Sequence, residues 1–174
     1  EGAAWSRSAA GIIGRTRSND MKLLEEFQEL ISVLEADGIE YATCGGIAMA
    51  IHGFIRATKD IDILIHERDL ERAFNAARSR GFEVEGLPLN FDDEGMRIRR
   101  ISKIDKESKN LITLDYILVS DVMSDVWEER QRVDWGTGRA WVVSRDGLIK
   151  MKRLAGRDID KVDIHRLENP GAES

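Results

Sequence analysis

Two aspartates, Asp60 and Asp62, are separated by one residue in the stretch TKDIDILI at residues 58–65. From residue 60 onward the other residues of this stretch are three isoleucines and a leucine. Side chains alternate along a strand, so both carboxylates would point to one face while the three isoleucines point to the other. Two close carboxylates repel each other unless a cation lies between them. Oxygen ligands on a rigid strand suit Mg²⁺, which completes its coordination with water and substrate phosphates. The pair predicts a site for Mg²⁺, or for Mn²⁺ in its place, although alone it also fits an exposed polar strand face.

A glycine pair lies upstream of the aspartates. Gly45 and Gly46 join a short strand at residues 40–44 to a short helix at residues 45–53. A glycine turn at the start of a helix leaves backbone N–H groups free to bind an anion. The alternative is a tight turn without a ligand. With the aspartates beside it, the turn predicts a triphosphate site next to the metal site.

A third carboxylate, Asp115, lies in the middle of the apolar run at residues 111–119. A buried charge is costly without a partner, so Asp115 either pairs with an arginine or lysine or binds a metal. If its strand lies beside residues 60–65, Asp115 meets Asp60 and Asp62 sideways. Three carboxylates could then hold two metal ions for in-line displacement at phosphorus.

The elements that must position these groups follow from the hydrophobic periodicity. The pattern predicts helices after Asp20, at residues 67–81, at residues 146–156 and at residues 158–167. It predicts further strands at residues 82–87, 96–104, 130–135 and 139–143. The chain of 174 residues is therefore expected to form one α/β (α+β) domain, a mixed central β-sheet flanked by helices with short C-terminal helices. We expect this domain at residues 21–168, after a disordered leader at 1–20 and before a flexible tail at 169–174.

Composition excludes some classes of protein. Hydrophobic residues make up 42% of the chain and charged residues 33%, and no apolar run is long enough to span a bilayer. The net charge of −6 argues against unspecific binding to a nucleic-acid backbone. The single cysteine, Cys44, excludes an internal disulfide and fits a cytoplasmic protein.

One local basic cluster departs from this acidic balance, and two interpretations of it are open. Its members lie at residues 97–109 and are Arg97, Arg99, Arg100, Lys103, Lys106 and Lys109. The cluster is either a solvated hairpin or a basic edge that guides a polyanionic acceptor.

Two motifs together resemble a known superfamily. The first, at residues 44–65, contains Gly45, Gly46, Ala48, His52, Gly53, Arg56, Thr58, Asp60 and Asp62. The second, at residues 148–164, contains Lys152, Ala155, Gly156, Arg157, Asp160 and Asp163. They resemble the nucleotidyltransferase superfamily related to DNA polymerase beta, and more closely the branch of abortive-infection and toxin–antitoxin nucleotidyltransferases. The resemblance implies the nucleotidyltransferase fold.

The resemblance also implies a reaction and roles for the residues. The reaction is transfer of a nucleoside monophosphate from an NTP to an acceptor hydroxyl, with release of pyrophosphate. Asp60 and Asp62 would hold two Mg²⁺ ions, and Asp115 would bind the catalytic ion while accepting the proton of the hydroxyl. The implied nucleotide-binding residues are Gly45, Gly46, Thr58, Lys152 and Arg157. Among them Lys152 would contact phosphate, and Arg157 would direct its fork to phosphate or to Asp163.

Three functions stay open at this point. The first is modification of tRNA or a partner protein in a toxin–antitoxin or phage-defence system, with an antitoxin partner or a homodimer. The second is modification of a small molecule, by an antibiotic nucleotidyltransferase of the lincosamide or aminoglycoside type. The third is a non-catalytic nucleotide-binding or interaction module of the same fold.

Overall fold

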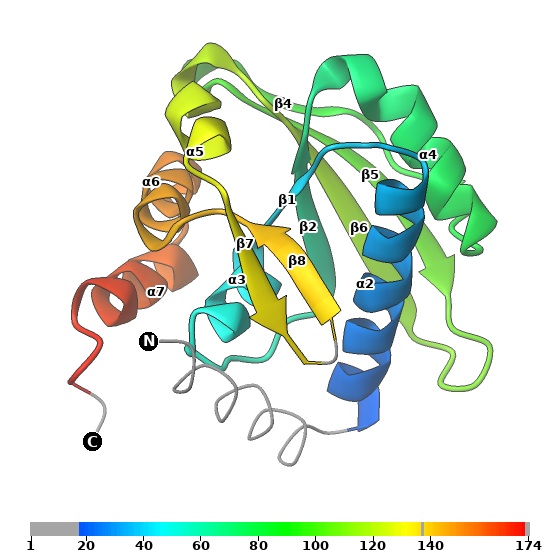
Figure 1. The fold of residues 1–174 in the computed structure, drawn as a ribbon, viewed down its shortest axis with the longest axis horizontal. Coiled ribbons are helices and arrows are strands. Elements are labelled where there is room, and N and C mark those ends of the chain that lie inside the picture. The colour runs from blue at the N-terminus through cyan, green and yellow to red at the C-terminus, as the bar shows by residue number, and fades with distance from the viewer. Residues whose placement is uncertain (1–17, 137, 173–174) are drawn as a thin grey trace.

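A computed structural model describes residues 18–136 and 138–172, with side chains described from residue 21 onward. Its centre is one mixed sheet of eight strands in the order β3-β5-β6-β2-β1-β8-β7, with β4 paired to β5 (Figure 1). The strands are β1 (Ala42–Cys44), β2 (Asp60–Ile65), β3 (Val84–Glu85), β4 (Leu89–Phe91), β5 (Met96–Ile104), β6 (Leu111–Leu118), β7 (Gln131–Trp135) and β8 (Gly138–Val142). The pairs β2–β6 and β1–β8 are parallel and the others are antiparallel.

Helices flank this sheet. The α-helices are α2 (Ser18–Ala36), α3 (Gly45–Ile51), α4 (Leu70–Ser79), α5 (Ser124–Glu128), α6 (Arg145–Ala155) and α7 (Asp158–Glu168). Short 3₁₀ turns lie at Glu67–Asp69, Asp92–Glu94 and Asp121–Met123. Helices α2 and α4 lie together on one face of the sheet, whereas α6 and α7 form a pair beside α3 (Figure 1).

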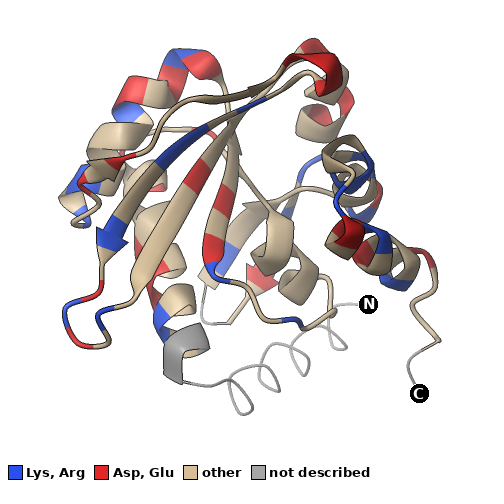
Figure 2. Ribbon diagram, turned by 180° about the vertical axis from the view of Figure 1, so that it is seen from behind, with Lys and Arg blue, Asp and Glu red and all other residues tan. Residues whose placement is uncertain are grey.

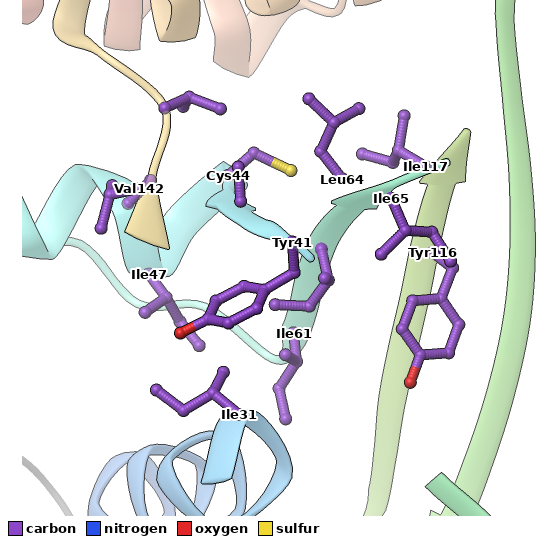
Figure 3. Close-up of a cluster of buried hydrophobic side chains, with 14 of the residues drawn as sticks. Ile31, Tyr41, Cys44, Ile47, Ile61, Leu64, Ile65, Tyr116, Ile117 and Val142 are labelled. Atoms are coloured by element: carbon purple, nitrogen blue, oxygen red, sulfur yellow. The ribbon is translucent and has the colours of Figure 1, made fainter. Parts of the chain in front are cut away.

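The core between α2, α4 and the sheet follows from the strand alternation. Ile61, Ile63 and Ile65 of β2 are fully buried on the face that meets these helices. Figure 3 shows Ile61 and Tyr41 on the side of Ile31 from α2, with Leu64 and Cys44 on the opposite side of their strands. Residues that precede or follow the buried isoleucines therefore point away from this core.

The opposite face of β5, β6 and β2 carries the aspartates, and we call it the open face only because no described helix lies across it in Figure 2. None of the described helices crosses these three strands in the view of Figure 2, where acidic segments of two strands lie beside a basic segment of the third. Asp60, Asp62 and Asp115 belong to this face by alternation.

The α/β architecture expected from the sequence is confirmed, with local differences. The strand expected at residues 82–87 is reduced to β3, and β4 and α5 are additional elements that the periodicity did not indicate. They have only three and five residues, so the hydrophobic pattern repeats too few times in either to be recognised. The first helix begins at Ser18, whereas most of the expected leader lies outside the described residues. Among the described helices, none has the length and apolar character needed to cross a bilayer.

Candidate active site

The three predicted carboxylates come together on the open face. Strand β6 lies parallel to β2, and Asp115 is the direct lateral partner of Asp62. Asp60 lies one step along the same face, opposite Thr113. The predicted sideways meeting of these strands is confirmed. Three acidic side chains therefore share one small area of the sheet.

The electrostatics of this group show an excess of negative charge. Burial, followed by the nearby Asp115 and Asp60 carboxylates, raises the pKa of Asp62 to about 7. Burial and then Asp115 also raise the pKa of Asp60. Within the described part of the chain, neither Asp60 nor Asp62 has a side-chain hydrogen bond or ion pair. These two carboxylates lack a cation, which is what a metal ion would supply.

Asp115 differs from the pair, because it already has a cation. Its carboxylate is 7% exposed and accepts two hydrogen bonds from Arg100, from Nε to Oδ1 at 2.8 Å and from Nη2 to Oδ2 at 2.8 Å. This hydrogen bonding raises the pKa of the Arg100 guanidinium further above its usual range. Of the two outcomes that the sequence left open for Asp115, the structure contains the arginine pair.

The three arginines of the basic cluster do not act together. Arg97 donates to Glu67 (2.9 and 3.0 Å), and Arg99 donates to Asn90 at 2.9 Å. Arg100 points to the opposite face of β5, toward Asp115. A basic edge made of all three arginines is therefore not present, because alternation separates neighbouring residues of a strand.

The glycine turn lies directly against the carboxylates. Gly45 has φ +62°, and a Cβ atom built on it would be 2.0 Å from Oδ2 of Asp62. A Cβ atom on Gly46 would be 2.5 Å from Oγ1 of Thr58. Only glycine lets the backbone approach these side chains so closely. The turn is thus in direct contact with Asp62, one of the metal-binding candidates.

Lys152 and Arg157 lie in an ion-pair network between α6 and α7. Lys152 is 4% exposed, and its Nζ lies 2.7 Å from Asp163 and 3.5 Å from Asp160. The Arg157 fork binds Asp160, at 2.7 Å from Nε and 3.1 Å from Nη2. Asp163, its expected carboxylate partner, pairs with Lys152 and with Arg56 at 3.4 Å. Lys152 joins the two helices, whereas Arg157 caps the start of α7 and its side chain is 65% exposed.

Comparison with known proteins gives the family. Residues 7–149 match the family described as uncharacterised nucleotidyltransferases. The chain belongs to this nucleotidyltransferase family. No curated protein matches the sequence.

Solved structures agree on the fold of this nucleotidyltransferase. TM1012 from Thermotoga maritima has a TM-score of 0.61 at 14% identity, and the match covers 86% of this chain and 94% of that one. ANT(2")-Ia in complex with adenylyl-2"-tobramycin has a TM-score of 0.60 at 10% identity, with 86% and 88% covered. JHP933 from Helicobacter pylori has a TM-score of 0.56 at 16% identity, with 87% and 66% covered. Likeness at these identities establishes the fold alone.

The residues of the nucleotidyltransferase fit a divalent cation in part. No group of three or more His, Cys, Asp and Glu residues in the described ranges is arranged to hold a metal ion. Two carboxylates, Asp60 and Asp62, are unpaired and adjacent, whereas both oxygens of Asp115 bind Arg100. The donor set is therefore suitable for Mg²⁺, which needs few protein ligands, and Asp115 is the ligand that must change its partner.

Sequence reasoning missed two arginines at this site. The sequence pattern places Arg100 in a basic cluster with its neighbours, whereas the antiparallel register places it beside Asp115. Arg56 appeared only as part of a motif, and its Nε is buried without a hydrogen-bond partner among the described residues. Alternation along the strand places residue 100 on the opposite face from residues 97 and 99. This separation identifies a partner for Arg100 only when the order of the strands is known.

Proposed function

We propose that this nucleotidyltransferase transfers a nucleoside monophosphate from an NTP to an acceptor hydroxyl and releases pyrophosphate. The observation that carries the proposal is the unpaired Asp60–Asp62 pair, which lies against the Gly45 turn and beside Asp115. Such a group of carboxylates next to a glycine turn suits a metal-bound triphosphate. The acceptor oxygen would form a bond to the α-phosphorus while the bond from that phosphorus to the bridging oxygen breaks.

Each side chain then has a role in this reaction. Asp60 and Asp62 would hold two Mg²⁺ ions, or Mn²⁺ ions, and Asp115 would share the catalytic one. When bound, the ions supply positive charge to the triphosphate and to the attacking oxygen. Asp115 would take the proton of the acceptor hydroxyl.

The nucleotide would lie on the side of Asp60 and Asp62 that meets the glycine turn. Gly45 and Gly46 would direct backbone N–H groups to the triphosphate, and Thr58 lines the same turn. Arg157 is exposed enough to contact a phosphate while bound to Asp160. Lys152 is more buried and pairs with Asp163, so it would contact phosphate only after leaving that carboxylate.

The acceptor is expected to be anionic. With the triphosphate on the β1 side of the carboxylates, in-line attack brings the acceptor across β6 and β5. The residues that flank Asp115 there are Arg100, Ser102 and Thr113, and none of them is acidic. We propose RNA, such as tRNA, as the acceptor, with Arg100 as the cation that would face it. A small molecule of the aminoglycoside type is the alternative. A cytoplasmic toxin–antitoxin or phage-defence setting, with an antitoxin partner or a homodimer, stays a prediction.

Labelling identifies the reaction directly. The protein is incubated with each α-³²P-labelled NTP, Mg²⁺ and either total cell RNA or RNA-free lysate. We expect label in the RNA fraction, with a yield that falls steeply as salt concentration rises because counterions are released. Asp62→Asn should abolish the label, whereas Asp134→Asn, at a side chain 86% exposed on β7, should not. Label in protein or small molecules alone would refute an RNA acceptor, and no label in any fraction would refute the transfer reaction.

A further inference from the structure

The pair of Arg100 and Asp115 joins two strands on the open face. The two residues are direct partners in the antiparallel register of β5 and β6, and Asp62 is the next residue along the same row. Both Asp115 oxygens accept a hydrogen bond from Arg100 at 2.8 Å. The Arg100 side chain is 41% exposed, so the guanidinium reaches the buried carboxylate from the solvent side.

The neighbouring strand end keeps Arg100 in this direction. Gly86 donates its backbone N–H to the carbonyl of Arg100 at 2.9 Å. A Cβ atom on Gly86 would be 3.2 Å from Cβ and 3.3 Å from Cγ of Arg100. Since glycine leaves room for the aliphatic stem, the guanidinium extends across the sheet toward Asp115.

This arrangement leaves an incomplete metal site in the free protein. Asp60 and Asp62 are unpaired, while Asp115 already has a cation on both oxygens. A second cation cannot use Asp115 fully unless Arg100 moves away, because like charges at contact distance repel.

We propose that Arg100 is a positioning residue that keeps Asp115 away from metal ions until nucleotide binds. The free protein then binds a divalent cation weakly, through Asp60 and Asp62, and all three carboxylates bind metal only in the presence of NTP. This inference rests on the proposed function, since it assumes that the three carboxylates form the metal site. Arg100 acts through Asp115 and takes no part in bond making.

Removal of the Arg100 charge should therefore strengthen metal binding. The three carboxylates and the guanidinium carry a net formal charge of −2, and Arg100→Gln changes it to −3. Loss of a positive charge next to the site should raise the nucleotide-free affinity for a divalent cation by about tenfold or more. Arg97→Gln is the matched control, because Arg97 lies on the same strand and also donates two hydrogen bonds to one carboxylate, that of Glu67, on the other face.

Titration with Mn²⁺ followed by electron paramagnetic resonance tests the inference at pH 8. Each protein is measured without nucleotide and with an NTP analogue that has a methylene group between the α and β phosphorus atoms. We expect Arg100→Gln to bind Mn²⁺ about tenfold or more tightly than wild type without nucleotide, and expect its gain in affinity from the analogue to be smaller. Arg97→Gln should match wild type in both conditions.

Two results would overturn the inference or the proposal beneath it. Equal nucleotide-free Mn²⁺ affinity in wild type, Arg100→Gln and Arg97→Gln would show that Arg100 does not restrict Asp115. Failure of wild type to bind Mn²⁺ even with the analogue would instead refute the metal site of the proposed function. If Arg100→Gln does not fold, Arg100→Met decides, because methionine also removes the positive charge while it keeps an aliphatic stem. Higher Mn²⁺ affinity in that variant supports the inference, and unchanged affinity refutes it.

Discussion

Replacement of Gly45 by alanine should show whether the glycine turn really contacts the Asp62 carboxylate. Gly45 has φ +62°, and the added methyl carbon would lie 2.0 Å from Oδ2 and 2.7 Å from Cγ of Asp62. Gly38 provides the control, because it has φ +66° but nothing within 4 Å of a Cβ atom. Both substitutions introduce left-handed strain, and only one introduces a collision.

The expected losses of stability follow from the backbone strain and from the collision with Asp62. Alanine in a left-handed conformation costs about 1–2 kcal/mol. Overpacking against a fixed neighbour adds about 1–3 kcal/mol. We therefore expect Gly38→Ala to lower the free energy of unfolding by about 1–2 kcal/mol and Gly45→Ala by about 2–5 kcal/mol. The substitution at position 45 should also displace the Asp62 carboxylate and weaken Mn²⁺ binding.

Urea denaturation of four proteins measures the contact. The proteins are wild type, Gly45→Ala, Asp62→Ala and the double variant, with Gly38→Ala measured alongside. Because Asp62→Ala removes the two closest atoms, the double variant should be more stable than the sum of the single changes predicts. Equal losses for Gly38→Ala and Gly45→Ala, together with additivity in the cycle, would refute the contact between the turn and the carboxylate.

Three further predictions concern individual side chains. Asp115→Asn should lower the transfer rate at least about 100-fold while NTP affinity and folding persist, as measured by single-turnover kinetics and calorimetry; unchanged activity per folded molecule would contradict a catalytic role. The Asp62 pKa of about 7, above its ordinary 3.8, means that the folded state keeps a proton that the unfolded chain loses. Wild-type stability should therefore fall relative to Asp62→Asn between pH 4 and pH 7, by about 1–3 kcal/mol in urea unfolding; a constant difference across this range would show that the pKa is not raised. Lys152→Met would remove the closest cation of the buried Asp163, which keeps only Arg56 at 3.4 Å, and should cost about 3–5 kcal/mol, whereas Arg153→Met, at a side chain 63% exposed, should cost less than about 0.5 kcal/mol. A loss of NTP affinity without loss of stability would instead identify Lys152 as a phosphate ligand.

Local patterns were sufficient to predict the central elements of the fold. The isoleucines of β2 and the apolar stripe of α2 have clear periods of two and of three to four residues, and both elements are present. Strand order could not be predicted from these local patterns, because the pairing between β2 and β6 joins residues about fifty positions apart. Periodicity says which face of each strand is apolar, but it does not say which strands become neighbours.

The candidate site likewise contains features that the sequence predicts and contacts that depend on the assembled sheet. Asp60 and Asp62 could be assigned to one face from their spacing alone, and Gly45 could be assigned to a turn from its type. The meeting of Asp115 with Asp62 depends on a register that only the assembled sheet fixes. The role of Lys152 was the least accessible, because burial between α6 and α7 depends on how two separate helices pack.

The adjacent arginines of β5 show how a single register decides electrostatic function. Arg99 and Arg100 must point to opposite faces, since neighbouring residues of a strand alternate. Arg99 binds Asn90, while Arg100 lies in the row with Asp115 and Asp62. A hypothesis based on the count of basic residues therefore overestimates the positive charge near the acceptor by the two arginines on the wrong face. Any attraction of an anionic acceptor from this strand must come from Arg100, whose charge becomes available only when it leaves Asp115.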